Sequence, residues 1–91
     1  MTEKLRVDVW LWRARFFKTR SLAERAVAEG AVRLERQGAV RLIEKPAEAV
    51  GPGDCLLIAS GRGVGAVRVV ALGARRGPPA EARALYEEIG A

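Results

Sequence analysis

The densest group of side chains that could do chemistry lies between Arg6 and Ser21. This stretch carries five Lys or Arg residues against one acid, and it holds both tryptophans and both phenylalanines. Basic side chains neutralise phosphates, and flat aromatic rings stack on unpaired bases. No acid occurs from residue 9 through residue 23, whereas an ordinary solvated face mixes both signs of charge. The stretch therefore predicts a surface that binds nucleic acid.

The charge of the whole chain supports the same partner. The 91 residues include 16 Lys or Arg and 11 Asp or Glu, so the formal net charge is +5 and the sequence pI is about 10.3. Residues 1–41 hold ten of the bases and five of the acids, and this surplus of five equals the net charge of the chain. A small domain whose positive charge is concentrated in one half fits a polyanionic partner.

Several classes of function are excluded by residues that the sequence lacks. It has no histidine and one cysteine, Cys55, which rules out the common zinc sites, histidine-based acid–base catalysis and Ser-His-Asp or Cys-His triads. We therefore expect no catalytic residues, metal or cofactor, and we interpret Cys55 as an inert core residue. The N-terminus has no apolar signal core, and the longest apolar run, Cys55 to Ala59, is far too short to span a membrane. We expect a cytoplasmic protein that does not bind membranes.

The basic stretch is predicted to form a helix at residues 8–17, followed by a turn. One apolar stripe recurs at helical spacing, with Asp8 in the first turn; it consists of Val7, Trp10, Leu11, Ala14 and Phe17. Val9, Trp12 and Phe16 form a second apolar stripe, which something must cover. We favour packing of Trp12 and Phe16 beneath a C-terminal helix over stacking of these rings on bases.

A second helix is predicted at residues 20–29. Its start is marked either by Thr19 as the N-cap or by Ser21 with Glu24 as a capping box. Gly30 is a natural stop in the left-handed position after a helix. The sequence thus joins two helices by the short basic turn Phe17-Lys18-Thr19-Arg20.

From residue 32 onward the apolar period changes to that of strands. Alternating residues predict strands around Val32–Glu35 and Val40–Leu42, joined by a Gln37-Gly38 turn and ended by Lys45-Pro46. Further strands are expected at 55–59 and 66–72. The fold class is therefore α+β, two helices before a small antiparallel sheet, with a last helix at 80–89 that presents Ala82, Leu85, Tyr86 and Ile89 on one face.

Two glycine-rich segments are better explained as turns than as sites. Gly61 to Gly65 matches neither the P-loop nor the dinucleotide-binding spacing, so we interpret it as a hairpin loop. Asp54 follows Gly51-Pro52-Gly53, and we expect it to cap its own turn rather than to act as a catalytic acid.

The pattern resembles a known family of RNA-binding domains. Arg6-x-Asp8-x-Trp10-Leu11, Lys18-Thr19-Arg20-Ser21-x-Ala23, Gly30-x-Val32 and Pro52-Gly53-Asp54 are similar to the RNA-binding domain of ribosomal protein S-four. A finer match resembles the bacterial ribosome-associated fifteen-kilodalton heat-shock proteins and covers nearly the whole chain. It lies in Asp8-x-Trp10-Leu11-Trp12-x-Ala14-Arg15-Phe16-x-Lys18-Thr19-Arg20, in Arg75-Arg76 and in Ala84-Leu85-Tyr86-Glu87-Glu88.

This resemblance implies an αL-type RNA-binding fold, with the RNA-binding domain at residues 1–77 and a C-terminal helix at 78–91 packing on it. It implies binding to ribosomal RNA on free large ribosomal subunits that still carry a peptidyl-tRNA, as part of their recycling after heat stress. Carried over by position, the RNA-contacting residues are Arg13, Arg15, Lys18, Thr19, Arg20, Ser21 and Arg33.

Two departures from the family stand out. The family turns its first hairpin with Asn-Gly, where this sequence has Glu35-Arg36-Gln37-Gly38 and about four extra residues before Lys45. The family also commonly continues with a basic tail, and this sequence ends at Ala91. If such a tail supplies ribosome affinity, we expect this protein to bind more weakly or at another place.

We therefore expect a monomeric, non-enzymatic RNA-binding protein. One rival is a duplex-DNA reader that uses the helix at 20–29, but Leu22, Ala23 and Ala26 are poor readers of base edges. A second rival is an RNA-modifying enzyme, for which the sequence offers no catalytic constellation. A third is a protein-interaction module that uses Trp12 and Phe16.

Overall fold

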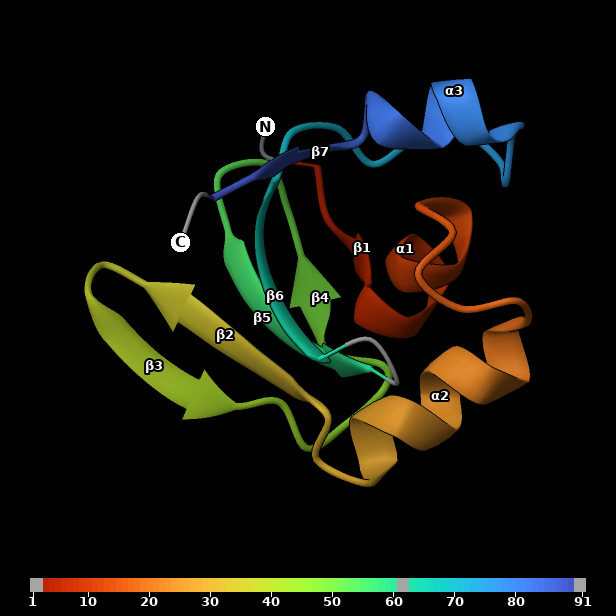
Figure 1. Cartoon of the computed structure of the whole chain (residues 1–91). Coiled ribbons are helices and arrows are strands. Elements are labelled where there is room, and N and C mark those ends of the chain that lie inside the picture. The colour runs from red at the N-terminus through yellow and green to blue at the C-terminus, as the bar shows by residue number, and fades with distance from the viewer. Residues whose placement is uncertain (1–2, 61–62, 90–91) are drawn as a thin grey trace.

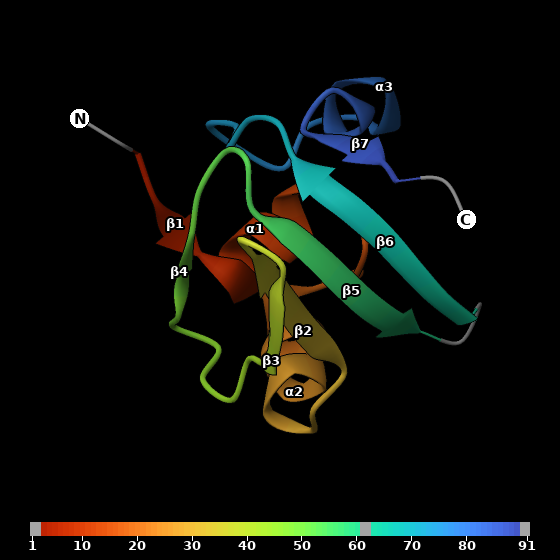
Figure 2. The same ribbon diagram turned by 90° about the vertical axis from the view of Figure 1, so that its left-hand side faces the viewer.

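The computed structural model describes residues 3–60 and 63–89 and shows two helices packed against one side of a curved sheet (Figure 1). The elements follow in the order β1 Leu5–Arg6, α1 Val7–Arg13, α2 Arg20–Ala28, β2 Val32–Arg36, β3 Ala39–Leu42, β4 Ala49–Val50, β5 Cys55–Ser60, β6 Gly63–Val69, α3 Pro79–Arg83 and β7 Tyr86–Glu88. Five strands form an antiparallel sheet in the order β3-β2-β5-β6-β7, and Figure 2 views this sheet with α1 and α2 behind it. The predicted α+β class is confirmed.

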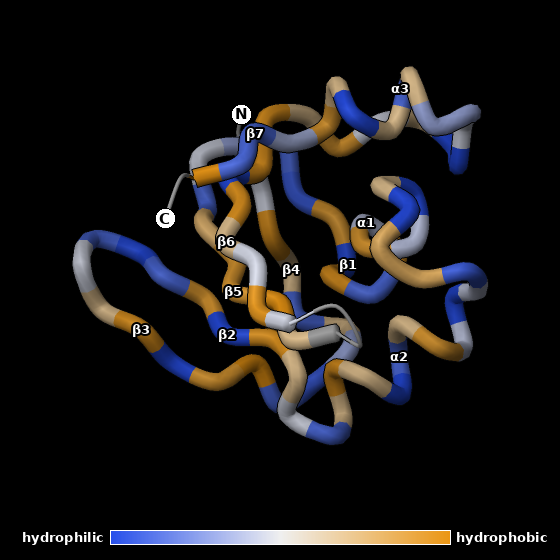
Figure 3. The backbone as a smooth tube through the Cα atoms, in the orientation of Figure 1, coloured by the Kyte–Doolittle hydropathy of each residue, from blue (hydrophilic) through white to orange (hydrophobic). Residues whose placement is uncertain are grey.

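The core lies between the helices and the inner face of the sheet. Trp10 and Leu11 of α1 and Val27 of α2 are fully buried. They belong to one cluster with inward-facing residues of the sheet, namely Val32, Leu34, Leu56, Ile58, Val67 and Val69. Hydrophilic and hydrophobic residues alternate along β2 (Figure 3), as expected for a strand with one buried face, whereas all four residues of β3 are exposed.

Short-range signals in the sequence located several element ends correctly. Thr19 is the N-cap of α2, because its side chain accepts a hydrogen bond from the N–H of Leu22; of the two predicted caps, this one forms. Gly30 has φ +87° directly after α2, as predicted for a stop residue. The β2–β3 hairpin turns at Gln37 and Gly38, with φ values of 53° and 81°, which suits a tight two-residue hairpin turn.

A second, two-stranded sheet was not predicted. β1 pairs with β4 through Leu5↔Val50 and Arg6↔Ala49, so the segment before α1 lies beside the segment after residue 48. Two-residue strands carry no alternation that a sequence pattern could detect. Their pairing places Gly51 so close to the backbone of Glu3 that an added Cβ would lie 2.7 Å from its carbonyl oxygen.

The predicted C-terminal helix at 80–89 is wrong beyond Arg83. The helix ends there, and residues 86–88 form β7, paired to β6 through Val67↔Glu88, Arg68↔Glu87 and Val69↔Tyr86. The unpaired edge of β6 offers backbone hydrogen bonds that a continued helix would leave unused. One contact of the predicted cover is nevertheless present, because the ring centroid of Tyr86 lies 4.8 Å from that of Phe16.

The β5–β6 hairpin also differs from the prediction. β6 begins at Gly63 and ends at Val69, rather than running from 66 to 72, so Gly63 and Gly65 are strand residues. The remainder of the predicted loop, residues 61–62, lies outside the described residues.

Asp54 caps its turn as predicted, and it also binds Arg36, so it links the end of β2 to the turn before β5. Its carboxylate accepts hydrogen bonds from the N–H of Gly51 at 2.9 Å and from Arg36 Nε and Nη2 at 3.0 and 2.9 Å. Burial alone would raise the pKa of Asp54, but the hydrogen bonds from Arg36 and Gly51, with the Arg36 charge, outweigh it, so this pKa lies below its usual value.

Because the folded-state pKa of Asp54 is lowered, its stabilising effect is present above the unfolded-state pKa and is lost as the pH falls through the folded-state pKa. We expect Asp54→Asn to lower the free energy of unfolding by about 1 kcal/mol at neutral pH. Urea unfolding at pH 7 and again well below the usual carboxyl pKa checks this, because the difference from the wild type should vanish at the lower pH. A pH-independent difference would show that the charge of Asp54 is not the cause.

Candidate nucleic-acid interface

Helix α1 ends in a tight reversal that turns the basic segment back toward the rest of the chain. The N–H of Phe16 donates to the carbonyl of Leu11 at 3.0 Å, and the N–H of Arg15 donates to that of Trp12 at 3.1 Å. This is the Schellman pattern, which needs a left-handed residue, and Arg15 fills that position with φ 66°. The predicted helix at 8–17 therefore stops at Arg13, and Phe16 and Phe17 leave the helix axis.

Two of the predicted RNA-contacting residues, Arg13 and Arg15, donate hydrogen bonds to backbone carbonyls of the connector after β6. Arg13 Nη1 donates to the carbonyl of Gly73 at 2.6 Å, and Arg15 Nε donates to that of Gly77 at 2.7 Å. In the other direction, Arg76 Nε donates to the carbonyl of Trp12 at 3.2 Å. We call Arg13, Arg15 and Arg76 the arginine clamp, because these bonds tie the end of α1 to residues 73–77.

The indole of Trp10 reinforces the arginine clamp from the core. Its Nε1 donates to the carbonyl of Ala71 at 2.9 Å, and the side chain is fully buried. Trp10, which belongs to the first apolar stripe of the predicted helix, is thus a core residue. The clamp was missed at the sequence level because backbone carbonyls of a connector carry no residue-type signal.

The cations at the start of α2 are arranged differently. Lys18 and Arg20 are exposed, and no carboxylate of the described residues forms an ion pair with either. Arg20 in particular is not paired with Glu24, although the two lie one turn apart. Ser21 is exposed beside them, while Thr19 is occupied as the N-cap.

The first N–H groups of α2 add to this positive charge. Within the described chain the N–H groups of Arg20 and Ser21 have no hydrogen-bond partner, since the Thr19 hydroxyl caps Leu22 and the Thr19 carbonyl takes Ala23. Free N–H groups and the positive end of the helix dipole attract anions. Lys18, Arg20 and Ser21 therefore form one exposed group whose charge and free N–H groups suit an anion, and we call it the α2 entry.

Arg33 does not share this location. It lies on β2 between the buried Val32 and Leu34, so its side chain is on the sheet face turned away from the core. On that face its register partners are Leu42 and Leu57. The structure therefore brings together Lys18, Arg20 and Ser21, and separates Arg33 from them.

A groove that was not predicted adjoins the α2 entry. Its volume is about 700 Å³, and it is lined on one side by the reversal after α1 and on the other by α3 and β7. Arg83 and Tyr86 contribute to it from the C-terminal segment, and neither was singled out as a binding residue. No sequence signal could have placed them here, because the groove depends on the pairing of β7.

Two absences hold for the described part of the chain. No helix there is both long and apolar enough to cross a bilayer. Residues 3–60 and 63–89 also contain no group of three or more His, Cys, Asp or Glu side chains placed to hold a metal ion.

Comparison with known proteins places this geometry in a family. The S4 domain family matches residues 5–54, more than half of the chain. A solved structure of heat shock protein 15 from Vibrio cholerae, described as trimeric, superposes with a TM-score of 0.81 at 36% sequence identity, covering 96% of this chain and 83% of that one. The chain belongs to the heat shock protein 15 family and carries an S4 domain.

Curated members of the heat shock protein 15 family give the same result. The Haemophilus influenzae homolog is 40% identical over 90 residues and the Escherichia coli protein is 38% identical over 85 residues. These matches cover 97% and 93% of this chain but only 64% and 60% of the relatives. The chain therefore spans less than two thirds of the length of these relatives.

Proposed function

We propose that this protein binds structured ribosomal RNA without catalysing a reaction, and that it does so on the large ribosomal subunit. Membership in the heat shock protein 15 family and the S4 domain support this proposal. So does the net charge of +5. The observation that carries it is the α2 entry, where Lys18 and Arg20 are exposed and lack carboxylate partners within the described chain.

The α2 entry suits phosphates better than base edges. Two cations and two free N–H groups converge on the start of one helix, which is the arrangement that binds phosphate groups. Affinity then comes from phosphate contacts, and specificity comes from matching the shape of a folded RNA. Of the carried-over residues, we keep Lys18, Arg20 and Ser21 as direct contacts, and we add Arg15, which lines the adjoining groove, through its terminal nitrogens.

The finer role is also a proposal. Recycling of large subunits that are stalled with a peptidyl-tRNA after heat stress requires a protein that recognises a free subunit. A rigid surface made by α1, the reversal and α2 is suited to docking on exposed ribosomal RNA. The monomeric state stays a prediction. It differs from the state of the Vibrio cholerae relative, which is described as trimeric.

Substitutions at the α2 entry test the RNA-binding proposal. We expect Lys18→Ala and Arg20→Ala each to weaken binding to ribosomal RNA by roughly 1–2 kcal/mol, as loss of a charge-assisted phosphate contact does. Stability should barely change, because both side chains are exposed. Fluorescence anisotropy with a folded fragment of large-subunit RNA, and with duplex DNA of the same length, measures both the loss and the preference for RNA.

Arg68→Ala is the matched control. It removes the same charge from the outward face of the sheet, where Arg68 pairs with Glu87 at 3.0 Å, and should leave RNA affinity nearly unchanged. If the double variant Lys18→Ala, Arg20→Ala binds like the wild type while Arg68→Ala does not, the binding surface lies on the sheet instead. Equal or tighter binding to duplex DNA would favour the DNA-reading alternative.

A further inference from the structure

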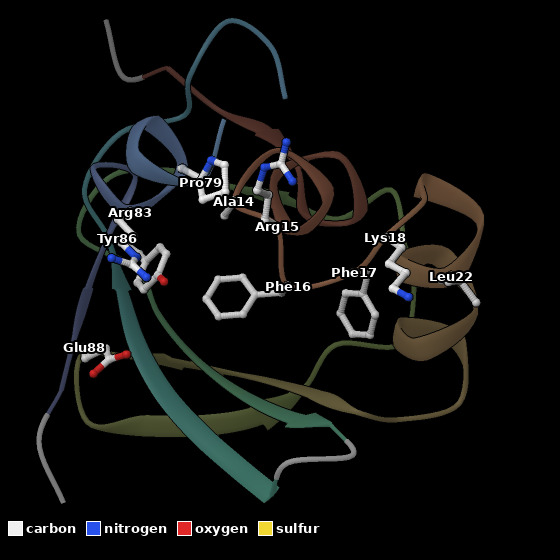
Figure 4. Close-up of a pocket in the computed structure, with 11 residues that line it drawn as sticks. Ala14, Arg15, Phe16, Phe17, Lys18, Leu22, Pro79, Arg83, Tyr86 and Glu88 are labelled. Carbon is white, nitrogen blue, oxygen red and sulfur yellow. The ribbon is translucent and has the colours of Figure 1, made fainter. Parts of the chain in front are cut away.

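The groove beside the α2 entry has two walls that are distant in sequence (Figure 4). The reversal after α1 supplies Arg15, Phe16 and Phe17, and Lys18 and Leu22 continue that wall toward α2. The other wall comes from α3 and β7, with Arg83, Tyr86 and Glu88 among its residues. A volume of about 700 Å³ is more than one flat ring needs, so a ring and the groups attached to it fit together.

The two phenylalanine rings in the groove differ in their contacts with other aromatic rings. Phe16 sits in the middle, with its ring centroid 5.9 Å from that of Trp10 and 4.8 Å from that of Tyr86. Phe17 is half-buried and has no aromatic partner among the described residues. Its ring projects into the groove beside Lys18 (Figure 4). The groove therefore presents one half-buried ring that packs against the core cluster but contacts no other ring among the described residues, next to two rings that contact each other.

The charge of the groove has one dominant sign. Arg15, Lys18 and Arg83 line it against the single acid Glu88. Neither Lys18 nor Arg83 forms an ion pair within the described chain, and Arg15 uses only its Nε on the carbonyl of Gly77. A purely apolar partner would leave these cations without compensation, whereas an anionic partner with a flat ring would satisfy both the cations and Phe17.

We propose that this groove binds one unpaired nucleotide of the RNA, with its base against Phe17 and its phosphate at Lys18, which lies beside that ring (Figure 4). The inference rests on the proposed function and adds a single-stranded contact to the phosphate contacts of the α2 entry. Splayed-out bases are commonly recognised by stacking on aromatic side chains, and a cation beside the ring places the backbone. The base here is selected by its π-face, so the groove recognises an unpaired nucleotide without reading its identity.

Two short RNAs separate the base contact from the charge contact. The first is penta-adenylate, and the second is the same backbone with abasic sites, which has the same number of phosphates and no bases. We expect the wild-type protein to bind penta-adenylate roughly tenfold more tightly than the abasic strand, the lower part of the range for base–aromatic stacking. The ring protons of Phe17 should shift in NMR spectra only with the strand that has bases.

Phe17→Leu is the decisive variant, because leucine keeps apolar packing and removes the flat ring. It should bind both strands equally, at the affinity that the wild type has for the abasic strand. Trp12→Leu is the control, since Trp12 is also half-buried but lies outside the groove, and it should keep the tenfold preference. Lys18→Ala should weaken both strands alike.

Three results would overturn the inference. The wild type could bind both strands equally, Phe17→Leu could keep the preference, or size-exclusion chromatography could show that Phe17→Leu dissolves an oligomer, in which case the groove holds a second copy of the chain. Failure of the proposed function looks different, because then neither short strand nor folded ribosomal RNA binds. Binding of folded RNA with no preference between the strands removes the inference alone.

Discussion

Replacing Asp8 by asparagine is expected to lower the free energy of unfolding by about 3 kcal/mol. The side chain of Asp8 is buried, with 1% of the residue exposed. Its carboxylate accepts hydrogen bonds from Arg6 Nε at 3.0 Å, from Arg6 Nη2 at 2.8 Å and from the N–H of Val9 at 2.8 Å. Because this carboxylate is buried, water cannot take the place of a hydrogen-bond donor that is lost.

The amide of asparagine has nearly the same shape, so the substitution changes hydrogen bonding rather than packing. Its NH₂ group would face the guanidinium of Arg6, donor against donor, and one of the two bidentate bonds would become a clash. The hydrogen bond to Asp8, and then its charge, raise the pKa of Arg6 above its usual value, so the contact favours the charged guanidinium.

Urea unfolding of Asp8→Asn measures this cost directly. Glu87→Gln is the matched control, because it makes the same carboxylate-to-amide change in an exposed ion pair with Arg68; it should shift the midpoint only slightly. If the two variants lose equal stability, the Arg6–Asp8 pair is an ordinary surface pair and does not hold β1 to the start of α1.

The sequence was sufficient wherever the deciding contacts are local. Thr19 caps α2 through a residue three positions ahead, Gly30 and Gly38 adopt the left-handed backbone that their turns require, and Asp54 bonds to Gly51 within its own turn. In each case the residue type alone sets the preference, so a pattern of a few residues predicts the outcome.

The sequence was not sufficient to predict the structure where segments distant in the chain compete for the same residues. Tyr86 fits a helical stripe as well as a strand, and only the free edge of β6 decides for β7. Arg13 has the same chemistry whether it contacts a phosphate or the carbonyl of Gly73. The sequence therefore indicated a basic, aromatic surface but could not say which arginines are held by the arginine clamp, nor that Arg83 would join Lys18 across a groove.

RNA binding by this protein is expected to depend steeply on salt. Several exposed cations near α2 have no carboxylate partner within the described chain, among them Lys18, Arg20 and Arg25, and Arg15 and Arg83 line the adjoining groove. If about four to six phosphates are neutralised, log K falls against log salt with a slope of about −3 to −5. Between about 50 and 200 mM salt the affinity should then drop roughly 10²- to 10³-fold.

The slope itself identifies which cations touch phosphates. Lys18→Ala and Arg20→Ala should each make the slope shallower by about 1, because each removes one released counterion. Arg68→Ala should leave the slope unchanged, since Glu87 already neutralises that guanidinium at 3.0 Å. Anisotropy titrations of one folded ribosomal RNA fragment at several salt concentrations give all four slopes. A wild-type slope near zero contradicts phosphate contacts as the source of affinity. Unchanged slopes in Lys18→Ala and Arg20→Ala, beside a steep wild type, move those contacts away from the α2 entry.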